Sequence, residues 1–168
     1  MVTIRPEQPK DIDGVRRINE QAFGTPKEAR LVDLLRDRGK LIVSLVAEAG
    51  DKLLGHIAFT LVNFPSRPEC RGVVLGPMAV LPAMQRRSVG SALVRSGLER
   101  CREMGYEFVV VVGHPRYYPR FGFVPAHRFG MKCSWPVPED TFMALELQAE
   151  ALAAPSGLVR YGPEFNEV

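Results

Sequence analysis

The spacing of apolar residues near the N-terminus changes from that of a strand to that of helices. Val2–Arg5 reads as a short strand, and apolar residues after Asp11 recur on one face at helical spacing. Thr25, Pro26 and Glu28 have the pattern of a capping box with Pro26 as the first residue of a second helix, and Gly39 is expected to end that helix. These patterns predict one strand followed by two amphipathic helices.

Longer apolar runs follow and predict strands. Leu41–Ala49 and Lys52–Val62 are joined by a Gly-Asp pair typical of a tight turn, which predicts a β-hairpin. Asn63–Arg71 is interrupted by prolines and is expected to be an irregular loop. Val73–Val80 is the next apolar run, so three strands are expected in succession.

A second helical pattern follows at Val89 and stops at Gly105. The run Glu107–Val112 then reads as a strand buried on both faces. A strand, a helix and a strand in this order imply a right-handed crossover with parallel strands. Thr141–Leu147 is expected to be one more strand.

The loop that opens this helix combines positive charge with unpaired backbone donors. The first N–H groups of a helix have no intrahelical partner, and the helix dipole adds partial positive charge at the same end. Phosphate groups bind well at such ends. Basic and polar side chains precede and form the turn, so a phosphate site is predicted here. Its candidate residues are Gln85, Arg86, Arg87, Ser88, Val89, Gly90 and Ser91.

Composition sets the size of the fold and the class of ligand. With 168 residues, 46% of them hydrophobic, the chain is long enough for one well-packed domain and too short for two. A single domain over 1–168 is therefore expected, with an irregular C-terminal tail over about 148–168. The net charge of +3 fits a small polyanionic ligand, and basic residues form no long run of the kind that binds nucleic acid.

The cysteines and the apolar segments indicate the cellular compartment in which the protein is expected. The three cysteines are widely spaced and form no CxxC pair, so neither a disulfide framework nor a metal site is expected. The N-terminus has no apolar signal core, and the apolar runs are shorter than a membrane span. A cytoplasmic protein that binds no membrane is therefore expected.

The residues of the basic loop resemble a known family. QRRSVGSA, which begins at Gln85, is similar to the acyl-CoA pyrophosphate loop of the GNAT superfamily of N-acetyltransferases. That loop has Gln or Arg, two residues, Gly, one residue, and then Gly or Ala. The chain departs at Ser88, where the family usually has its first Gly. Ser88 is expected to be tolerated with a right-handed backbone.

A second segment extends the resemblance. GHPRYYPRFGF, from Gly113 to Phe123, resembles the GNAT segment in which a short helix carries a Tyr four residues before a Gly-Phe pair. Tyr118 matches that Tyr, but the helix before it is shorter than in the family. The resemblance covers roughly Thr3 to Leu147, and Arg128–Glu139 within it looks like a subfamily feature. It implies a mixed α/β (α+β) domain with a mostly antiparallel sheet, helices around it, and one parallel strand pair splayed around the CoA site.

The resemblance also implies roles for individual residues. Met78, Ala79 and Val80 are implied as contacts of the pantetheine and the acyl carbonyl. Tyr118 is implied as the general acid, because a phenol with an unperturbed pKa of about 10 carries a proton at neutral pH and a leaving thiolate accepts one. The strand that enters the loop has no glutamate of the kind that serves as base in many family members. His114 is the candidate base, and the alternative is that it caps the turn before the next proline.

The function that the resemblance implies is acetyl transfer from acetyl-CoA, as a co-substrate, to a primary amine of a small molecule or peptide. No metal is needed for that reaction. An alternative is an acyl-CoA-binding sensor domain with little turnover, and retention of Tyr118 favours the enzyme. Neither nucleic acid nor a membrane is expected as a partner, and a homodimer remains open beside a monomer.

Overall fold

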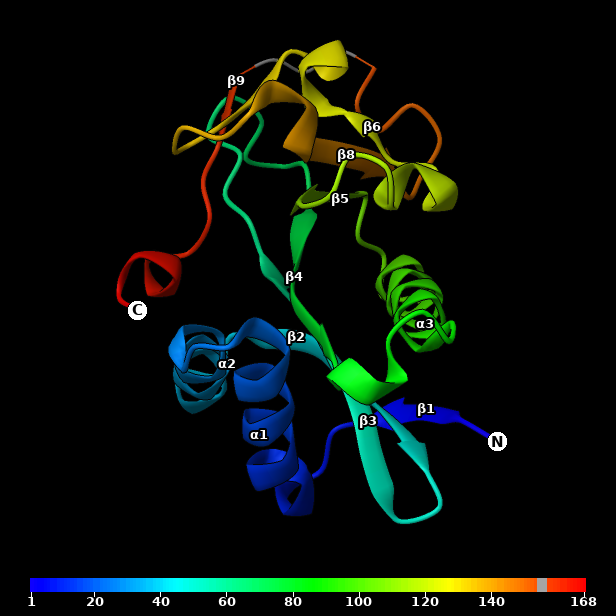
Figure 1. Ribbon diagram of the computed structural model, residues 1–168. Helices are drawn as coiled ribbons and strands as arrows, with labels where there is room; N and C mark the ends of the chain where they lie inside the picture. Colours follow the sequence, from blue (N-terminus) through cyan, green and yellow to red (C-terminus); the bar gives the residue numbers. More distant parts are fainter. Residues whose placement is uncertain (154–156) are drawn as a thin grey trace. The chain divides into compact units, whose positions relative to one another are not determined.

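The computed structural model describes residues 1–153 and 157–168 (Figure 1). Three α-helices are present in the described chain: α1 (Ile12–Phe23), α2 (Lys27–Asp37) and α3 (Val89–Glu103). The strands are β1 (Thr3–Pro6), β2 (Leu41–Ala49), β3 (Lys52–Leu61), β4 (Gly72–Val80), β5 (Phe108–Val112), β6 (Val124–Pro125), β7 (Met131–Cys133), β8 (Phe142–Glu146) and β9 (Gly157–Val159). Short 3-10 turns are η1 (Pro9–Asp11), η2 (Pro82–Met84), η3 (Tyr118–Phe121), η4 (Ala126–Phe129), η5 (Glu139–Thr141) and η6 (Pro163–Asn166).

Seven strands form one sheet in the order β1-β2-β3-β4-β5-β8-β6. β4 and β5 pair in parallel, whereas β1–β2, β2–β3, β5–β8 and β6–β8 pair antiparallel. The predicted mixed fold, with a mostly antiparallel sheet, one parallel pair and helices around it, is confirmed. The hairpin of β2 and β3 was predicted to within one residue.

The start of α2 differs slightly from the prediction. Pro26 is the residue before the helix rather than its first residue, and α2 begins at Lys27. The hydroxyl of Thr25 accepts a hydrogen bond from the Lys27 N–H (3.4 Å), one of the N–H groups that lack an intrahelical partner.

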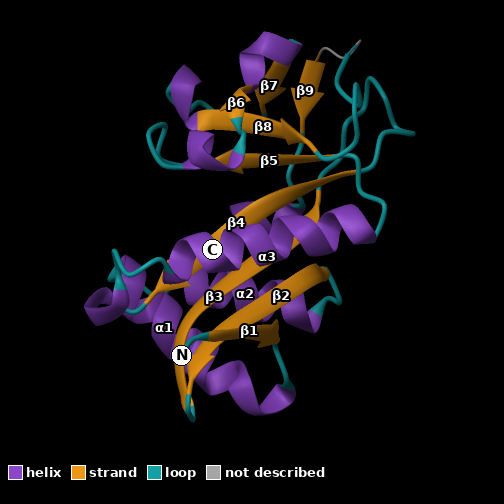
Figure 2. Cartoon of the chain, turned by 90° about the vertical axis from the view of Figure 1, so that its right-hand side faces the viewer, coloured by secondary structure: helices purple, strands orange, loops and turns teal. Residues whose placement is uncertain are grey.

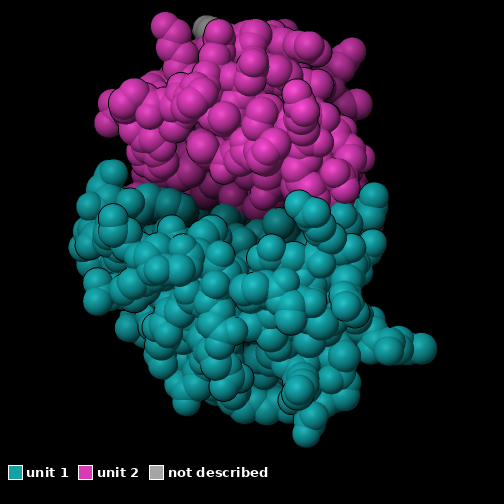
Figure 3. Space-filling view, in the orientation of Figure 1, with its two compact units in different colours: residues 1–60, 76–97, 163–168 teal, residues 61–75, 98–162 magenta. Residues whose placement is uncertain are grey.

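The described chain divides into two compact units (Figure 3). Unit 1 comprises Met1–Thr60, Gly76–Gly97 and Pro163–Val168, and unit 2 comprises Leu61–Leu75 and Leu98–Gly162. The boundary falls inside β4 and inside α3, and it separates Leu61 from the rest of β3, so each of these elements contributes residues to both units.

In unit 1, α1 and α2 pack together (Figure 1). Each of the two helices has buried residues on one face. Val15 of α1, Val32 of α2 and Val46 of β2 form a buried cluster, and Leu53 of β3 packs against it. Full burial of such a side chain stabilises the fold by about 1.5–3 kcal/mol. The helical spacing of apolar residues is therefore explained by this contact with the sheet.

Two glycines let the part of α3 that belongs to unit 1 lie close to the strands of that unit. A Cβ atom on Gly97 would lie 2.2 Å from Cε1 of Phe59, and a Cβ atom on Gly55 of β3 would lie 3.1 Å from the Ala79 carbonyl oxygen. The same Cβ atom on Gly55 would lie 3.3 Å from Cγ1 of Val89, the first residue of α3. These close approaches fix where the N-terminus of α3 lies relative to the end of β4.

Unit 2 is built around β5. Phe108, Val109, Val110 and Val111 are buried, as expected for a strand covered on both faces. The ring of Phe64 packs edge-on against Phe108, with ring centroids 5.9 Å apart. On one side β5 pairs with β8, from Phe108 opposite Glu146 to Val112 opposite Phe142 in the antiparallel register.

The C-terminal region contains more regular structure than the sequence predicted. β7 and β9 form a separate two-stranded parallel sheet, seen in Figure 2, in which Met131 pairs with Gly157 and Cys133 with Val159. β9 and η6 lie within the segment 148–168, for which an irregular tail was predicted. Strands of three residues are too short for an alternating pattern to identify them. Residues 154–156 of that segment lie outside the described part of the chain.

Within the described residues, no helix has both the length and the apolar character needed to cross a membrane.

Candidate active site

The predicted phosphate loop connects β4 to α3 in unit 1. Residues 85–88 are exposed, and Val89 is buried against Gly55, so the loop is open to solvent while the helix behind it is anchored. The side-chain amide of Gln85 donates a hydrogen bond to the Val80 carbonyl (3.1 Å). This bond ties the start of the loop to the end of the strand.

Two residues that are not glycine turn the loop through left-handed conformations. Arg86 has φ of 63° and Ser88 has φ of 66°. The expectation that Ser88 is right-handed is therefore wrong: Ser88 is left-handed, a conformation that glycine adopts without steric cost and serine does not. The backbone requirement of the turn outweighs the cost of a Cβ atom, and α3 begins immediately afterwards at Val89.

The N-terminus of α3 presents backbone N–H groups and positive charge together. The N–H of Ala92 donates a hydrogen bond to the Ser88 carbonyl (3.0 Å), and this bond closes the first turn of the helix. For the N–H groups that precede Ala92, the carbonyl four residues earlier lies outside the helix. The first turn of α3 has no acidic residue, and the exposed Arg86 and Arg87 precede it. Cations at this end oppose the helix dipole, so the arrangement favours a bound anion rather than helix stability.

The implied pantetheine contacts lie at the end of β4, also in unit 1. Ala79 is buried, whereas Met78 and Val80 are half-buried. The parallel pairing of β4 with β5 spans Gly72–Val74 and Phe108–Val110. The three implied contacts thus come later in β4 than its paired segment.

Tyr118 opens η3 in unit 2 and is 8% exposed. Its ring packs edge-on against Tyr117 and Phe123, with centroids 5.1 and 5.7 Å away. Burial, with a smaller contribution from the nearby Tyr117, raises the pKa of the Tyr118 hydroxyl above its ordinary value of about 10. Tyr118 therefore holds its proton throughout the neutral range.

Gly113 positions this ring and was not singled out from the sequence. A Cβ atom on Gly113 would lie 2.3 Å from Cε2 of Tyr118, closer than any real contact allows. The signal that could have identified Gly113 is a glycine directly after a buried strand, where close approach of another group is common.

His114 has the geometry of the turn-capping alternative. Its side chain is exposed, and its Nδ1 accepts a hydrogen bond from the Arg116 N–H (3.3 Å). Its carbonyl also accepts from the N–H of Tyr117 (3.1 Å). When Nδ1 accepts, the neutral ring carries its proton on Nε2, which then donates rather than accepts. With Nδ1 occupied by the Arg116 N–H and Nε2 protonated, the His114 ring has no nitrogen available to accept a proton from the amine.

The structure thus brings the predicted residues together in two groups. The end of β4 and residues 85–91 lie in unit 1, and His114 and Tyr118 lie in unit 2. Among the residues that the structure describes, no group of three or more His, Cys, Asp or Glu side chains is arranged to hold a metal ion.

Comparison with known proteins identifies the family. The family described as an acetyltransferase (GNAT) domain matches residues 3–126. The uncharacterized N-acetyltransferase YhbS of Escherichia coli strain K12 is 35% identical over 164 residues, which cover 97% of this chain and 98% of YhbS. The uncharacterized N-acetyltransferase YjhQ of the same strain is 40% identical over 134 residues, covering 77% of this chain and 74% of YjhQ.

Two solved structures are similar over nearly the whole chain. A crystal structure of E. coli YhbS in complex with CoA has a TM-score of 0.94 at 34% identity and covers 98% of this chain and 92% of that one. A GNAT family acetyltransferase from Brucella melitensis in complex with acetyl-CoA has a TM-score of 0.81 at 34% identity, with 98% of both chains covered. The matched domain, these relatives and the shared fold together show that the chain belongs to the GNAT family of acetyltransferases.

Proposed function

We propose that this protein transfers the acetyl group of acetyl-CoA to a primary amine of a small molecule or peptide. The observation that carries the proposal is the N-terminus of α3, where Arg86 and Arg87 precede a first turn without acidic residues. The two similar structures with CoA and acetyl-CoA support the same ligand. Residues 1–168 would act as a single acyltransferase domain in the cytoplasm, and no nucleic acid or membrane would take part.

The proposed role of the loop is to hold the pyrophosphate. The left-handed residues Arg86 and Ser88 turn the backbone, and the N–H groups of Val89, Gly90 and Ser91 would face the phosphate oxygens. The guanidinium groups of Arg86 and Arg87 would add charge-assisted hydrogen bonds. Met78, Ala79 and Val80 would contact the pantetheine and the acyl carbonyl from the end of β4.

The proposed role of Tyr118 is that of general acid. In the transfer, the amine nitrogen forms a bond to the acyl carbon, the carbon–sulfur bond breaks, and the thiolate takes the Tyr118 hydroxyl proton. The proton lost by the amine passes to a base or to solvent. The raised pKa of Tyr118 keeps the donor protonated but makes it a weaker acid than a free tyrosine, so the reaction depends on its position as well as on its acidity.

The proposed role of His114 follows from its geometry. Because Nδ1 accepts from the Arg116 N–H, His114 would act as base only after this bond is broken. His114→Asn keeps a short acceptor for the turn but removes the imidazole. We expect this variant to retain its fold, and a fall in turnover with an unchanged melting temperature would assign the base to His114 rather than to solvent.

Ligand binding tests the loop. CoA should raise the melting temperature, because a ligand that binds only the folded state stabilises it. Gly90→Val should abolish the shift by blocking approach of a phosphate to the backbone. Replacing both Arg86 and Arg87 by Ala should weaken CoA much more than pantetheine, which has no phosphate. Equal losses for both ligands would show that the arginines act on folding instead.

Steady-state kinetics separate an enzyme from an acyl-CoA sensor. Tyr118→Phe removes only the hydroxyl, so turnover should fall about 10²- to 10⁴-fold while the affinity for acetyl-CoA stays the same. Tyr117→Phe, the same change in the neighbouring ring, is the matched control. Unchanged turnover in Tyr118→Phe contradicts the acid role. Binding of acetyl-CoA without acetylation of any amine in a broad screen favours the sensor.

A further inference from the structure

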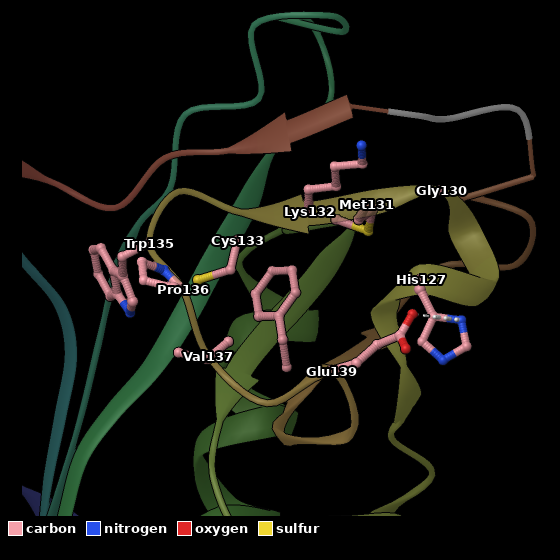
Figure 4. Close-up of a pocket in the computed structure, with 10 residues that line it drawn as sticks. His127, Gly130, Met131, Lys132, Cys133, Trp135, Pro136, Val137 and Glu139 are labelled. Atoms are coloured by element: carbon pink, nitrogen blue, oxygen red, sulfur yellow. Dashed lines mark ion pairs between the residues drawn. The ribbon is translucent and has the colours of Figure 1, made fainter.

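Unit 2 contains a pocket of about 310 Å³ that has no role in the chemistry described above (Figure 4). The apolar part of its lining comes from three places: Met131 and Cys133 of β7, Phe142 of β8, and Trp135 and Val137 between these strands. Met131 and Phe142 are buried, and the other three side chains are half-buried. A cavity of this size with mostly apolar walls suits a small organic ligand.

The carboxylate of Glu139, which also lines the pocket, bears on the kind of ligand. Nδ1 of His127 and an oxygen of Glu139 lie 3.9 Å apart, too far for a hydrogen bond, so the carboxylate keeps acceptor capacity toward a ligand. Figure 4 shows these two side chains facing each other, whereas the Lys132 side chain points away from them. An anionic group beside apolar walls favours a ligand with an apolar body and a positive charge.

Backbone pairing links the pocket to Tyr118 within unit 2. Phe142, which lines the pocket, pairs with Val112 at the end of β5. The next residue, Gly113, donates its N–H to the Thr141 carbonyl (2.9 Å) and lies against the Tyr118 ring. The pocket wall and the proposed acid are therefore attached to the same pair of strand ends.

We propose that this pocket holds the apolar part of the acceptor, and that the acceptor is a small apolar primary amine whose ammonium group is attracted by Glu139. This inference rests on the acetyltransferase function proposed above. It narrows the acceptor from amines in general to amines with an aliphatic or aromatic body that fits the pocket.

Trp135 is the single tryptophan of the chain, so its fluorescence reports on the pocket directly. Hexylamine, hexanol and hexanoate have the same alkyl chain with a positive, a neutral and a negative end. We expect a saturable change in Trp135 fluorescence that requires the lowest concentration for hexylamine and the highest for hexanoate. No change with hexylamine, or equal affinity for all three compounds, would overturn the proposal.

Variants separate the apolar wall from the charge. Val137→Phe should weaken hexylamine at least about tenfold by filling the cavity, and Cys133→Phe fills it from β7 if the first variant melts early. Glu139→Gln should weaken hexylamine about two- to fivefold, the effect of one exposed charge, and should leave hexanol unchanged. Asp140→Asn, the adjacent carboxylate outside the pocket lining, is the matched control. Full affinity in both cavity-filling variants would overturn the proposal.

A thiol-release assay with acetyl-CoA distinguishes this inference from the function on which it rests. If hexylamine is acetylated and its KM rises in Val137→Phe, the result supports both the pocket assignment and the proposed acetyltransferase function. Acetylation of other amines without any response of Trp135 to hexylamine overturns the pocket assignment alone. A response of Trp135 without acetylation of any amine overturns the acceptor role, and with it the proposed function.

Discussion

Ser88 has a backbone conformation that side chains seldom adopt. Its φ of 66° costs a residue with a Cβ atom about 1–2 kcal/mol relative to the right-handed region. The strain lies directly before α3, where the backbone would approach the phosphates. Strain at a binding loop is expected where the geometry of the loop serves a ligand.

Substitutions at Ser88 should follow this strain. Ser88→Gly is expected to retain CoA binding and to raise the free energy of unfolding by up to about 1 kcal/mol, whereas Ser88→Val should lower it by about 1–2 kcal/mol. Urea unfolding measures both. Ser96→Val, inside α3, is the control, because serine and valine have similar helix propensities. A Ser88→Val protein as stable as the Ser96→Val protein contradicts the assigned conformation.

His56 is a second residue whose surroundings constrain it. It is fully buried on β3, with its Nε2 2.9 Å from the Ser44 hydroxyl and its Nδ1 3.5 Å from the side-chain nitrogen of Asn19. Burial, with a smaller contribution from the positive charge of Arg36, lowers the pKa of His56 to about 3. The folded protein therefore keeps this ring neutral.

The lowered pKa of His56 predicts a loss of stability in mild acid. The unfolded chain takes up a proton near pH 6.5 and the folded chain only near pH 3, so the stabilisation is complete above pH 6.5 and declines as the pH falls toward 3. Between pH 7 and 5 the free energy of unfolding should fall by about 2 kcal/mol from this group alone. Urea unfolding at both pH values measures it. His56→Leu should remove that part of the decline, and an equal decline in both proteins contradicts the prediction.

At the scale of elements, the junction between β5 and η3 carries the proposed acid. The strand ends at Val112, and Gly113 allows the Tyr118 ring to lie against the backbone. Tyr117, Phe121 and Phe123 surround that ring, so the ring cannot shift without disturbing a packed aromatic cluster.

Gly113→Ala should therefore impair catalysis through the position of Tyr118. The added methyl group would displace the ring or the turn, and we expect turnover to fall about tenfold or more and stability to fall by about 1–3 kcal/mol. Acetylation rates and urea unfolding measure the two effects. The variant with Tyr118→Phe added should lose little further activity, because the displaced hydroxyl no longer donates. Fully additive losses in the double variant would contradict this explanation.

Sequence patterns predicted the elements whose order is set by local signals. The hairpin of β2 and β3, the start of α3 at Val89 and the buried strand β5 were all predicted, because each has a long apolar pattern with a turn residue beside it. β7 and β9 were not, because each has three residues and pairs with a partner far along the chain. The left-handed Ser88 was not predicted either, since serine gives no local sign of that conformation.

The pocket of unit 2 shows the same limit for sites. Its walls come from Met131 to Val137, whose pattern indicates neither a strand nor a motif, and from Phe142, which belongs to the predicted strand Thr141–Leu147. β7 belongs to the two-stranded sheet and β8 to the seven-stranded sheet. The walls of the pocket therefore depend on strand pairings between distant parts of the chain. The predicted phosphate loop is a contiguous motif, so a sequence can suggest it, whereas a pocket assembled by strand pairing leaves no contiguous pattern.

At the scale of the whole molecule, the two units are not successive segments of the chain. Unit 1 includes the C-terminal residues Pro163–Val168, which pack with α2 at the other end of the sequence. The Arg38 guanidinium, directly after α2, forms ion pairs with Glu164 (3.2 Å) and Glu167 (2.6 Å). Glu164 is buried, and Phe165 beside it is half-buried.

Removal of Pro163–Val168 should destabilise unit 1 although the proposed catalytic residues lie elsewhere. The truncated protein loses the partly buried Phe165 and the two carboxylates that pair with Arg38, and loss of the buried surface of Phe165 alone should lower the free energy of unfolding by about 1–2 kcal/mol. Urea unfolding measures the loss. Deletion of Glu167 and Val168 alone keeps Glu164 and Phe165 and should have a much smaller effect, because Glu167 is exposed and such ion pairs contribute little. If both truncations unfold at the urea midpoint of the full chain, the C-terminal residues do not hold α2 in place.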